Sequence, residues 1–235
     1  MITVSIVSHG HGALVGSLLT RLCALPLVES IIFTVNTPEN LPSSSIHPKI
    51  RIIHNSLPKG YGQNHNAAFQ HVKTPFFCIL NPDISIITDP FPRLVEISKN
   101  QGFDLLAPVV ADRNGIVQDS ARHFPTLLSL ARKLLSGHPG ITTAKPENDL
   151  LDSDWLAGMF MFFKTEFFAR LSGFDERYFL YYEDVDICRR LRRQGGRLRQ
   201  VLDLTVIHDA RRDSRRKLKF AVMHARSAAR FLLSR

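Results

Sequence analysis

The sequence predicts an α/β protein in which helices flank a mostly parallel central sheet. Short runs rich in β-branched residues alternate with stretches of helical periodicity over roughly the first hundred residues. The run 75–86 begins with an almost wholly apolar stretch, as expected at the centre of a sheet covered on both faces. Ligands of such doubly wound sheets bind beyond the carboxyl ends of the strands.

The first predicted elements form a strand–helix–strand unit. ITVSIV predicts a strand at 2–7, and SIIFTV predicts another at 30–35. Between them, ALVGSLLTRLCAL has the apolar spacing of a helix at 13–25. This order is typical of a βαβ opening.

A third strand is predicted at 50–55. Pro and Gly then punctuate a turn, before a helix that begins near Asn64 or Asn66. The apolar run that follows ends in the triplet NPD at 81–83. This triplet therefore lies at the carboxyl end of a strand, where ligands are expected.

The pattern after Gly102 is less regular. FDLLAPVVAD predicts a strand at 103–112, and the apolar run 155–163 returns to the core. The polar stretch 136–150 is either a lid or acceptor loop, or a plain connection.

Two short helices and a late strand complete the predicted elements. Helices are expected at 164–174 and 183–195, the second stopping at Gly195, and a strand ends at His208. The basic tail from Arg211 to Arg235 has apolar residues at helical spacing, namely Leu218, Val222, Ala225, Ala229 and Leu232.

The composition indicates one large α/β domain in a reducing compartment. The chain has 235 residues, of which 44% are hydrophobic. The spacing of Cys23, Cys78 and Cys188 fits neither a zinc ribbon nor a disulfide framework, so reduced thiols are expected. No apolar run approaches the roughly 20 residues that span a bilayer, and no signal peptide is recognised. A cytoplasmic location is expected.

The net charge of +9 and the pI near 9.8 leave three classes of partner open. These are nucleic acid, an anionic membrane surface and phosphate-bearing substrates. A nucleic-acid-binding face would interleave basic and aromatic residues, whereas here the aromatic run 178–182 lies beside acids that repel phosphate. Nucleic acid is therefore not the expected partner.

Asp83 is the first candidate for chemistry. It follows a buried strand through a Pro-containing turn, so it is held at the ligand-binding edge, where it could take a divalent cation that also binds a diphosphate. The alternative is an aspartate that makes the turn or caps the next segment.

Three acids at the start of the helix 183–195 form the second candidate. Asp186 can pair with Arg189 or Arg190 at helical spacing, which leaves Glu183 and Asp184 available. Acids suit a helix N-terminus for electrostatic reasons alone. Neighbouring aromatic rings, however, tend to raise the pKa of a carboxyl group, which could then serve as a general base.

Two further features carry weaker signals. His208 ends a strand and is a metal ligand or an ordinary capping or core histidine. The turn Gly60-Tyr61-Gly62 could let the backbone approach a phosphate, although it matches neither the Rossmann fingerprint nor a P-loop.

Read in order, these segments resemble the family 2 glycosyltransferases with the GT-A fold, and within them the rhamnosyltransferase-type branch. The resemblance runs through VSIVSHG, NSLPKGYGQNHNAAF, NPDISI and VIHDARRDS, and covers nearly the whole chain. Its most specific part is GFDERYFLYYEDVDICRRLRRQG, at 173–195.

The resemblance implies a role for each candidate. Asp83 corresponds to the one acid kept from the family's metal-binding DxD motif, so it would hold Mg²⁺ or Mn²⁺ bridged to the donor diphosphate. His208 matches a further metal or diphosphate contact. Asp184 matches the base that takes the proton of the acceptor hydroxyl, with Glu183 as its nearest rival. A hydroxyl that attacks opposite the departing diphosphate inverts the anomeric carbon.

The resemblance also marks a donor-binding set, with two departures from the family pattern. Val35 and Asn36 stand where the family has an Asp-Asn pair, so base recognition is expected to use Asn36 or Glu39. The first strand ends in SHGHG in place of a Thr-Tyr-Asn-like turn. The predicted donor contacts are Ser8, His9, Asn36, Glu39, Gly62, Asn64 and Asp83. The expected donor is a dTDP- or UDP-linked sugar, with rhamnose favoured.

The implied organisation is a GT-A domain at 1–210, with a nucleotide-sugar half at 1–100, an acceptor and catalytic half at 101–210, and a basic helix at 211–235. The acceptor is expected to be a polysaccharide or a lipid-linked glycan. The densest basic patch comprises Arg211, Arg212, Arg215, Arg216, Lys217 and Lys219. It either contacts an anionic inner membrane face or is a solvated helix face that attracts diphosphates. A rival enzyme class, the sugar-phosphate nucleotidyltransferases, would show a Gly-rich loop with a Lys or Arg near the first strand, and SHGHGALVG has neither Lys nor Arg.

Overall fold

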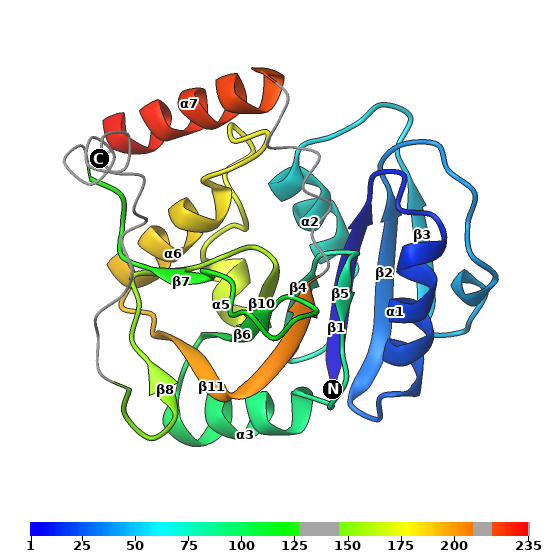
Figure 1. The fold of residues 1–235 in the computed structure, drawn as a ribbon, viewed down its shortest axis with the longest axis horizontal. Helices are drawn as coiled ribbons and strands as arrows, with labels where there is room; N and C mark the ends of the chain where they lie inside the picture. The colour runs from blue at the N-terminus through cyan, green and yellow to red at the C-terminus, as the bar shows by residue number, and fades with distance from the viewer. Residues whose placement is uncertain (127–145, 209–217, 235) are drawn as a thin grey trace.

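The computed structural model describes residues 1–126, 146–208 and 218–234. Nine strands of these residues form one twisted sheet, with helices on both faces (Figure 1). The strands are β1 (Ile2–Ser8), β2 (Val28–Val35), β3 (Ile50–His54), β4 (Phe76–Leu80), β5 (Ile84–Ser85), β6 (Leu105–Ala111), β8 (Leu150–Leu151), β10 (Phe160–Lys164) and β11 (Leu198–His208). A separate two-stranded ribbon pairs β7 (Ala121–Arg122) with β9 (Trp155–Leu156).

The strand order is β3-β2-β1-β4-β10-β6-β11-β5, with β8 on the side of β11. The strands β3, β2, β1 and β4 are all parallel, and β6 is parallel to β11. The strand β10 joins these two groups and lies antiparallel to both β4 and β6. Every antiparallel pairing in this sheet therefore involves β10 or β11, which come from the later half of the chain, where the sequence pattern is less regular.

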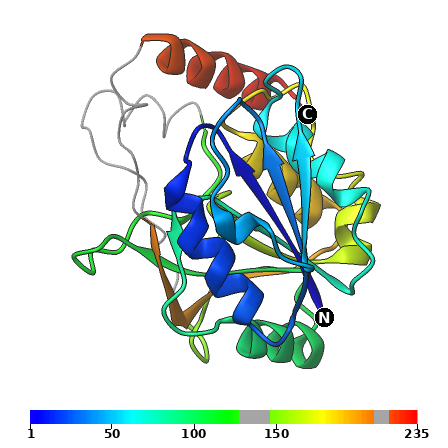
Figure 2. The same cartoon turned by 90° about the vertical axis from the view of Figure 1, so that its right-hand side faces the viewer.

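The helices form a layer on each face of the sheet. They are α1 (Ala13–Ala24), α2 (Tyr61–Phe69), α3 (Phe91–Gln101), α5 (Thr165–Arg170), α6 (Glu183–Arg193) and α7 (Leu218–Leu233), with a 3₁₀ turn η1 (Ser43–Ser45). The helices α1 and α3 share one hydrophobic cluster with the sheet, whereas α2, α5 and α6 share the other. The helix α7 lies outside α6, across the top of the fold (Figures 1 and 2).

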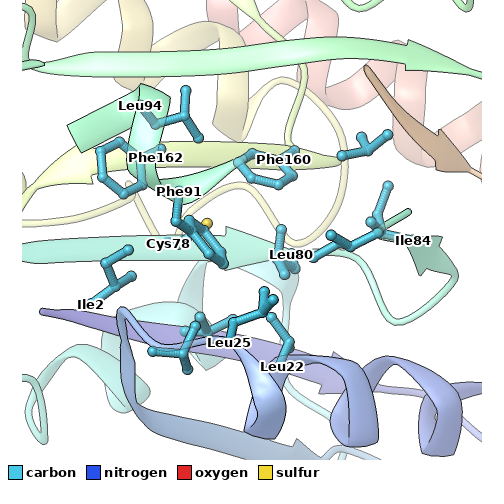
Figure 3. Close-up of a cluster of buried hydrophobic side chains, with 14 of the residues drawn as sticks. Ile2, Leu22, Leu25, Cys78, Leu80, Ile84, Phe91, Leu94, Phe160 and Phe162 are labelled. Carbon is cyan, nitrogen blue, oxygen red and sulfur yellow. The ribbon is translucent and has the colours of Figure 1, made fainter. Parts of the chain in front are cut away.

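The central strand β4 shows why the sheet is covered on both faces. Its side chains alternate, so that Phe76, Cys78 and Leu80 belong to the cluster under α1 and α3, and the other two residues belong to the opposite cluster. Figure 3 shows the first cluster, in which the rings of Phe160 and Phe162 from β10 lie beside β4. Every side chain of β4 is thus apolar because both of its faces are buried.

Most of the predicted elements are confirmed, with three differences. The helix α2 begins at Tyr61 rather than near Asn64, because the Asn64 N–H already donates to the Gly60 carbonyl in its first turn. The apolar run 75–86 is two strands, broken at the NPD turn. The helix expected at 164–174 ends at Arg170, since Ser172 and Gly173 adopt positive φ. Most of the predicted loop 136–150, up to residue 145, lies outside the described residues.

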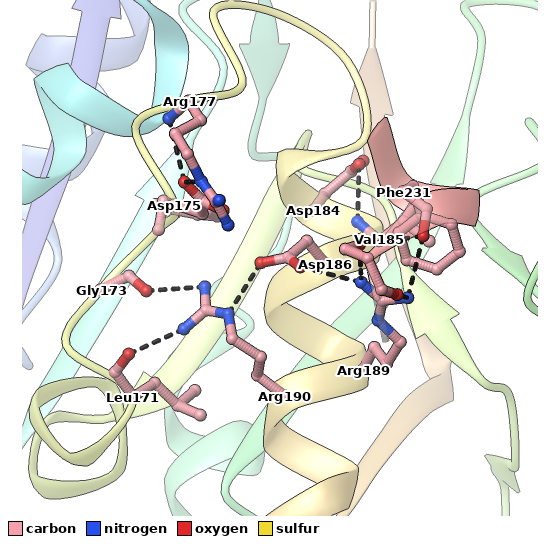
Figure 4. A network of polar contacts seen from close by, with 12 residues as sticks. Leu171, Gly173, Asp175, Arg177, Asp184, Val185, Asp186, Arg189, Arg190 and Phe231 are labelled. Carbon is pink, nitrogen blue, oxygen red and sulfur yellow. Dashed lines mark hydrogen bonds and ion pairs between the residues drawn. The ribbon is translucent and has the colours of Figure 1, made fainter. Parts of the chain in front are cut away.

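Buried ion pairs on α6 attach this helix to both of its neighbours. Asp186 pairs with Arg189 at 3.3 Å and with Arg190 at 2.7 Å, which confirms its predicted structural role. Arg190 also donates to the carbonyls of Leu171 and Gly173, at the turn after α5 (Figure 4). Arg189 donates to the Phe231 carbonyl and lies over the Phe231 ring, so it holds α7 against α6.

None of the described helices is long and apolar enough to cross a membrane.

Candidate active site

One edge of the sheet gathers most of the predicted site residues. The strands β1, β2 and β4 are parallel, and β6 and β11 run the same way because β10 is antiparallel to both β4 and β6. The carboxyl ends of these strands therefore meet at one edge. Ser8 and His208 are the last residues of β1 and β11, and Asn36 and Asp83 follow β2 and β4. Sheet topology thus brings together residues from both halves of the chain.

The two predicted metal residues are neighbours in the structure. His208 Nε2 lies 3.2 Å from Asp83 Oδ1, and the two side chains are 10% and 11% exposed. The pairing of β11 with β5 produces this contact, because His208 is in register with Ile84, the residue after Asp83. The other imidazole nitrogen, Nδ1, lies 2.9 Å from Gln118 Oε1.

A carboxylate beside an imidazole fits a divalent cation such as Mg²⁺ or Mn²⁺. The 3.2 Å contact lacks hydrogen-bond geometry. Within the described residues, Asp83 Oδ1 is buried with no hydrogen-bond partner, and a buried oxygen of this kind is suited to coordinate a cation. Within the described parts of the chain, no group of three or more His, Cys, Asp or Glu side chains could hold a metal ion. The remaining ligands of a cation here would come from a bound diphosphate and water.

Glu183 and Asp184 form the first turn of α6, and their environments differ. The Asp184 carboxylate is half-buried; Oδ2 accepts the Gly158 N–H at 3.0 Å and Oδ1 accepts the Val185 N–H at 2.9 Å. Glu183 is 5% exposed, and its Oε2 is buried without a hydrogen-bond partner. Burial raises the pKa of Glu183 well above its ordinary value, and the charge of Asp184 raises it further.

The surroundings of this pair favour the anion more strongly at Asp184 than at Glu183. Burial also raises the pKa of Asp184, but the N–H groups of Gly158 and Val185 oppose that shift by stabilising its anion. At Glu183 only its own backbone N–H opposes the rise in pKa, and the buried Oε2 has no hydrogen-bond partner within the described residues, so burial favours the neutral form of this carboxyl group. Of the two acids, Asp184 is therefore the one able to accept a proton from a ligand.

Tyr61 connects this carboxylate to the start of α2. Its hydroxyl donates to the Gly158 carbonyl, and the N–H of the same glycine donates to Asp184. The Tyr61 N–H donates to the Phe179 carbonyl at 2.9 Å, and a Cβ on Gly60 would lie 2.7 Å from that carbonyl oxygen. The turn before α2 and the aromatic segment before α6 thus approach backbone to backbone, which requires glycine at position 60.

The aromatic segment reaches α6 through an unusual backbone. Tyr181 and Tyr182 have φ of 69° and 68°, a left-handed conformation that bulky residues rarely adopt. The ring of Tyr182 is buried against Phe231 of α7, and Ser227 of α7 donates to the Leu180 carbonyl. Packing against α7 therefore stabilises the strained turn that sets the start of α6.

An amide network lies at the predicted nucleotide end of the edge. Asn36 Oδ1 accepts from Asn55 Nδ2 at 2.6 Å and from the Lys59 N–H, while its Nδ2 donates to the Lys59 carbonyl and lies 3.0 Å from His9 Nδ1. Asn64 accepts from Asn55 and donates to the Gly60 carbonyl. The amides of Asn36 and Asn64 thus hold the turn before α2, and a direct contact with nucleotide stays a prediction for both.

Glu39 and Ser8 lie around the loop that follows β1. Glu39 Oε2 accepts the Gly12 N–H at 2.7 Å, whereas its Oε1 is buried with no hydrogen-bond partner. Ser8 Oγ accepts the His11 N–H at 3.2 Å. Of the predicted donor contacts, Glu39 therefore keeps an acceptor atom without a partner within the described structure.

Gly62 has a packing role. A Cβ at this position would lie 2.6 Å from Phe174 Cβ, so α2 can approach the segment after α5 only with glycine here. Its predicted contact with a phosphate is not tested by this geometry.

Four residues that hold the site were not among the predicted ones: Asn55, Tyr61, Gly158 and Gln118. In the sequence, Tyr61 is only the middle of a glycine turn, and Gly158 interrupts an apolar run. Nothing in the spacing of these residues relates them to Asp184 or His208, because each acts through a contact between distant segments.

Replacing Glu183 by Gln is expected to stabilise the protein at neutral pH. A carboxyl group whose pKa is raised in the folded state contributes stability that is complete below its unfolded pKa and is lost as the pH rises. Gln removes this loss, so the stability gain of the variant should grow between pH 4 and pH 8, as measured by urea unfolding. Glu29→Gln, at an exposed carboxylate, is the matched control. A gain that is independent of pH would refute the protonated state of Glu183.

Comparison with known proteins agrees with this geometry. Residues 34–166 match the family model described as Glycosyl transferase family 2. Rhamnosyltransferase WbbL of Escherichia coli (strain K12) is 31% identical over 247 residues, which cover 99% of this chain and 92% of that protein. An N-acetylglucosaminyl-diphospho-decaprenol L-rhamnosyltransferase of Mycobacterium tuberculosis (strain ATCC 25618 / H37Rv) is 27% identical, over 80% of this chain and 68% of that protein.

Solved structures share the fold at lower sequence identity. The mannosyltransferase PcManGT from Pyrobaculum calidifontis, in complex with GDP-Man and Mn²⁺, has a TM-score of 0.67 at 16% identity and covers 97% of this chain and 64% of its own. GalNAc-T7 with UDP, GalNAc and Mn²⁺ also has a TM-score of 0.67, at 18% identity, but this chain spans only 43% of it. These likenesses confirm the predicted GT-A fold. The chain therefore belongs to glycosyltransferase family 2 and is a glycosyltransferase of the rhamnosyltransferase-like branch.

Proposed function

We propose that this enzyme transfers a sugar, with rhamnose favoured, from a dTDP- or UDP-linked donor to a hydroxyl of a polysaccharide or lipid-linked glycan, with inversion at the anomeric carbon. One observation carries the proposal: the Asp83–His208 pair and Asp184 lie at the same edge of the sheet. Asp184 is at this edge because it accepts the N–H of Gly158, just before β10, and β10 begins there. The names of the relatives in E. coli and M. tuberculosis support rhamnose, and the second name supports a lipid diphosphate acceptor.

The proposed reaction is a single displacement. The acceptor oxygen forms a bond to the anomeric carbon as the bond from that carbon to the diphosphate oxygen breaks on the opposite face. Asp184 takes the hydroxyl proton, and the diphosphate departs with the bonding electrons. The backbone N–H groups on Asp184 keep its carboxylate oriented, so the base does not have to reorganise during transfer. Burial disfavours a second negative charge beside it on Glu183.

Asp83 and His208 would hold Mg²⁺ or Mn²⁺ at this edge. The cation, when bound, neutralises charge that develops on the leaving diphosphate. Of the remaining predicted donor contacts, we propose that the exposed His9 contacts the diphosphate or sugar, whereas the buried Ser8, Gly62 and Asn64 act by shaping the turns around the donor. We assign base recognition to Glu39, whose Oε1 suits an N–H or hydroxyl donor, with the buried Asn36 holding the neighbouring turn.

The thermal stability of Asp83→Ala tests donor and metal binding. Wild type is expected to gain melting temperature with UDP or dTDP, or with their sugars, when Mn²⁺ is present, because a ligand of the native state stabilises it. Asp83→Ala should lose the part of the shift that depends on Mn²⁺, and the nucleotide with the largest shift identifies the donor class. Glu96→Ala, an exposed carboxylate on α3, is the control. The absence of a shift with any nucleotide, GDP included, would overturn the proposal.

The identity of the base is tested by a pair of substitutions. Asp184→Asn is expected to lower kcat by about 100- to 10,000-fold, the usual contribution of a general base. Glu183→Gln should retain most of the activity, because burial favours the neutral form of Glu183, which Gln imitates. Since burial raises the pKa of Asp184, kcat/KM of wild type should fall on the acid side at a pH above the ordinary range of aspartate. Equal losses in the two variants would show that the assignment is wrong.

We also propose a cytoplasmic location with peripheral membrane contact through residues 211–219. Charge supports this contact, since six of these nine residues are Arg or Lys. Residues 211–217 lie outside the described structure. Co-flotation with liposomes that contain an anionic lipid is expected at low salt and should weaken as salt rises. Protein that stays at the bottom of the gradient would remove the proposed contact.

A further inference from the structure

We propose that Gln118 is a positioning residue that holds the His208 imidazole in the tautomer and orientation needed to bind a divalent cation beside Asp83. The inference rests on the proposed metal site and adds a residue to it. Gln118 does not contact Asp83 in the described hydrogen bonds; it acts on the metal site through His208.

The amide of Gln118 makes two contacts with the same residue. Its Nε2 donates to the His208 backbone carbonyl at 3.0 Å, and its Oε1 lies 2.9 Å from His208 Nδ1. A carbonyl oxygen only accepts hydrogen bonds, so the NH₂ group must face it. This leaves the amide oxygen facing the ring, and Nδ1 must therefore carry the hydrogen.

The tautomer determines what His208 presents to Asp83. With the hydrogen on Nδ1, the neutral imidazole has its lone pair on Nε2, which lies 3.2 Å from the buried Asp83 Oδ1. These two acceptor atoms, His208 Nε2 and Asp83 Oδ1, then face each other without a hydrogen bond. A cation bound beside them would stabilise this arrangement. A metal-binding histidine commonly donates its other N–H to a fixed acceptor, which is the part that Gln118 plays here.

A short hairpin after β6 delivers Gln118 to this position. Asp112 closes the turn, because its Oδ1 accepts the N–H groups of Asn114 and Ile116 and its own N–H donates to the Ile116 carbonyl. The Gln118 N–H then donates to the Val110 carbonyl at 2.7 Å. Since β6 is parallel to β11 and Ala111 is in register with Ile207, the hairpin brings Gln118 alongside the end of β11.

The first test reads the tautomer without any metal. In metal-free wild type labelled with ¹⁵N-histidine at pH 8, the two ring nitrogens of His208 should show Nδ1 protonated and Nε2 bare. Gln118→Met keeps the size of the side chain and removes both hydrogen bonds, so the Nδ1–H form should lose its dominance. Nε2 protonated in wild type, or an unchanged tautomer in Gln118→Met, would overturn the inference.

The second test measures cation affinity. Mn²⁺ is titrated into protein with the nucleoside diphosphate that gives the largest thermal shift, and free Mn²⁺ is followed by electron paramagnetic resonance. Gln118→Met should weaken Mn²⁺ binding by about 10- to 100-fold, the usual effect of losing a partner of a ligating histidine. Gln118→Glu keeps an acceptor for Nδ1–H and should lose less. Gln101→Met, at an exposed glutamine, is the matched control and should bind as wild type does.

The outcomes separate this inference from the proposed function. If wild type binds Mn²⁺, Asp83→Ala does not, and a folded Gln118→Met binds as wild type does, then the metal site stands and the role of Gln118 is refuted. If wild type itself binds no Mn²⁺ with any nucleotide, the metal-dependent function and the role of Gln118 both fail. Should Gln118→Met not fold, Gln118→Glu decides: a loss as large as that of Asp83→Ala would contradict the proposal.

Discussion

The buried ion pairs of Asp186 with Arg189 and Arg190 are the interaction on which the arrangement of the site depends. Asp186 lies one turn inside α6, and its two arginines tie the helix to the turn after α5 and to α7 (Figure 4). Asp186 is 6% exposed and its arginines are 14% and 26% exposed, so loss of Asp186 would leave two partly buried guanidinium groups without their carboxylate. The position of α6, and with it that of Asp184, is therefore strongly constrained.

The two acids at the start of α6 acquire different properties from their surroundings, although they are adjacent in sequence. Asp184 is half-buried and receives two backbone N–H groups, whereas Glu183 is buried and its Oε2 has no hydrogen-bond partner in the part of the chain that the structure describes. Separation of the pKa values of neighbouring acids is how active sites assign a charged and a neutral role. One of the N–H groups on Asp184 comes from Gly158, whose carbonyl accepts from Tyr61. Asp184 is thus linked to the turn that the Asn36 and Asn64 amides hold.

The metal-binding end of the site joins segments that lie far apart in sequence. Asp83 follows the central strand β4, His208 ends β11, and Gln118 arrives on a hairpin between them. His208 lies in the paired strand β11, whereas Asp83 lies in the short turn before β5 and Gln118 follows an isolated bridge to β6, so all three are close to backbone pairing. Sites built on paired strands hold their geometry more closely than sites built on free loops.

Sequence by itself determined the α/β class, the order of the first strands and helices, and the family, because these depend on local periodicity and on motifs such as the run 173–195. It also marked Asp83, Glu183, Asp184 and His208 as candidates, since their residue types and places at element ends are local properties. Only the tertiary structure decided that β10 runs antiparallel, that Asp83 and His208 touch, that two backbone N–H groups favour the anion at Asp184, and that Gln118 contacts His208 and Tyr61 contacts Gly158. The physical reason is that pairing, burial and hydrogen bonding between distant segments depend on how the whole chain packs, which no short stretch of sequence specifies.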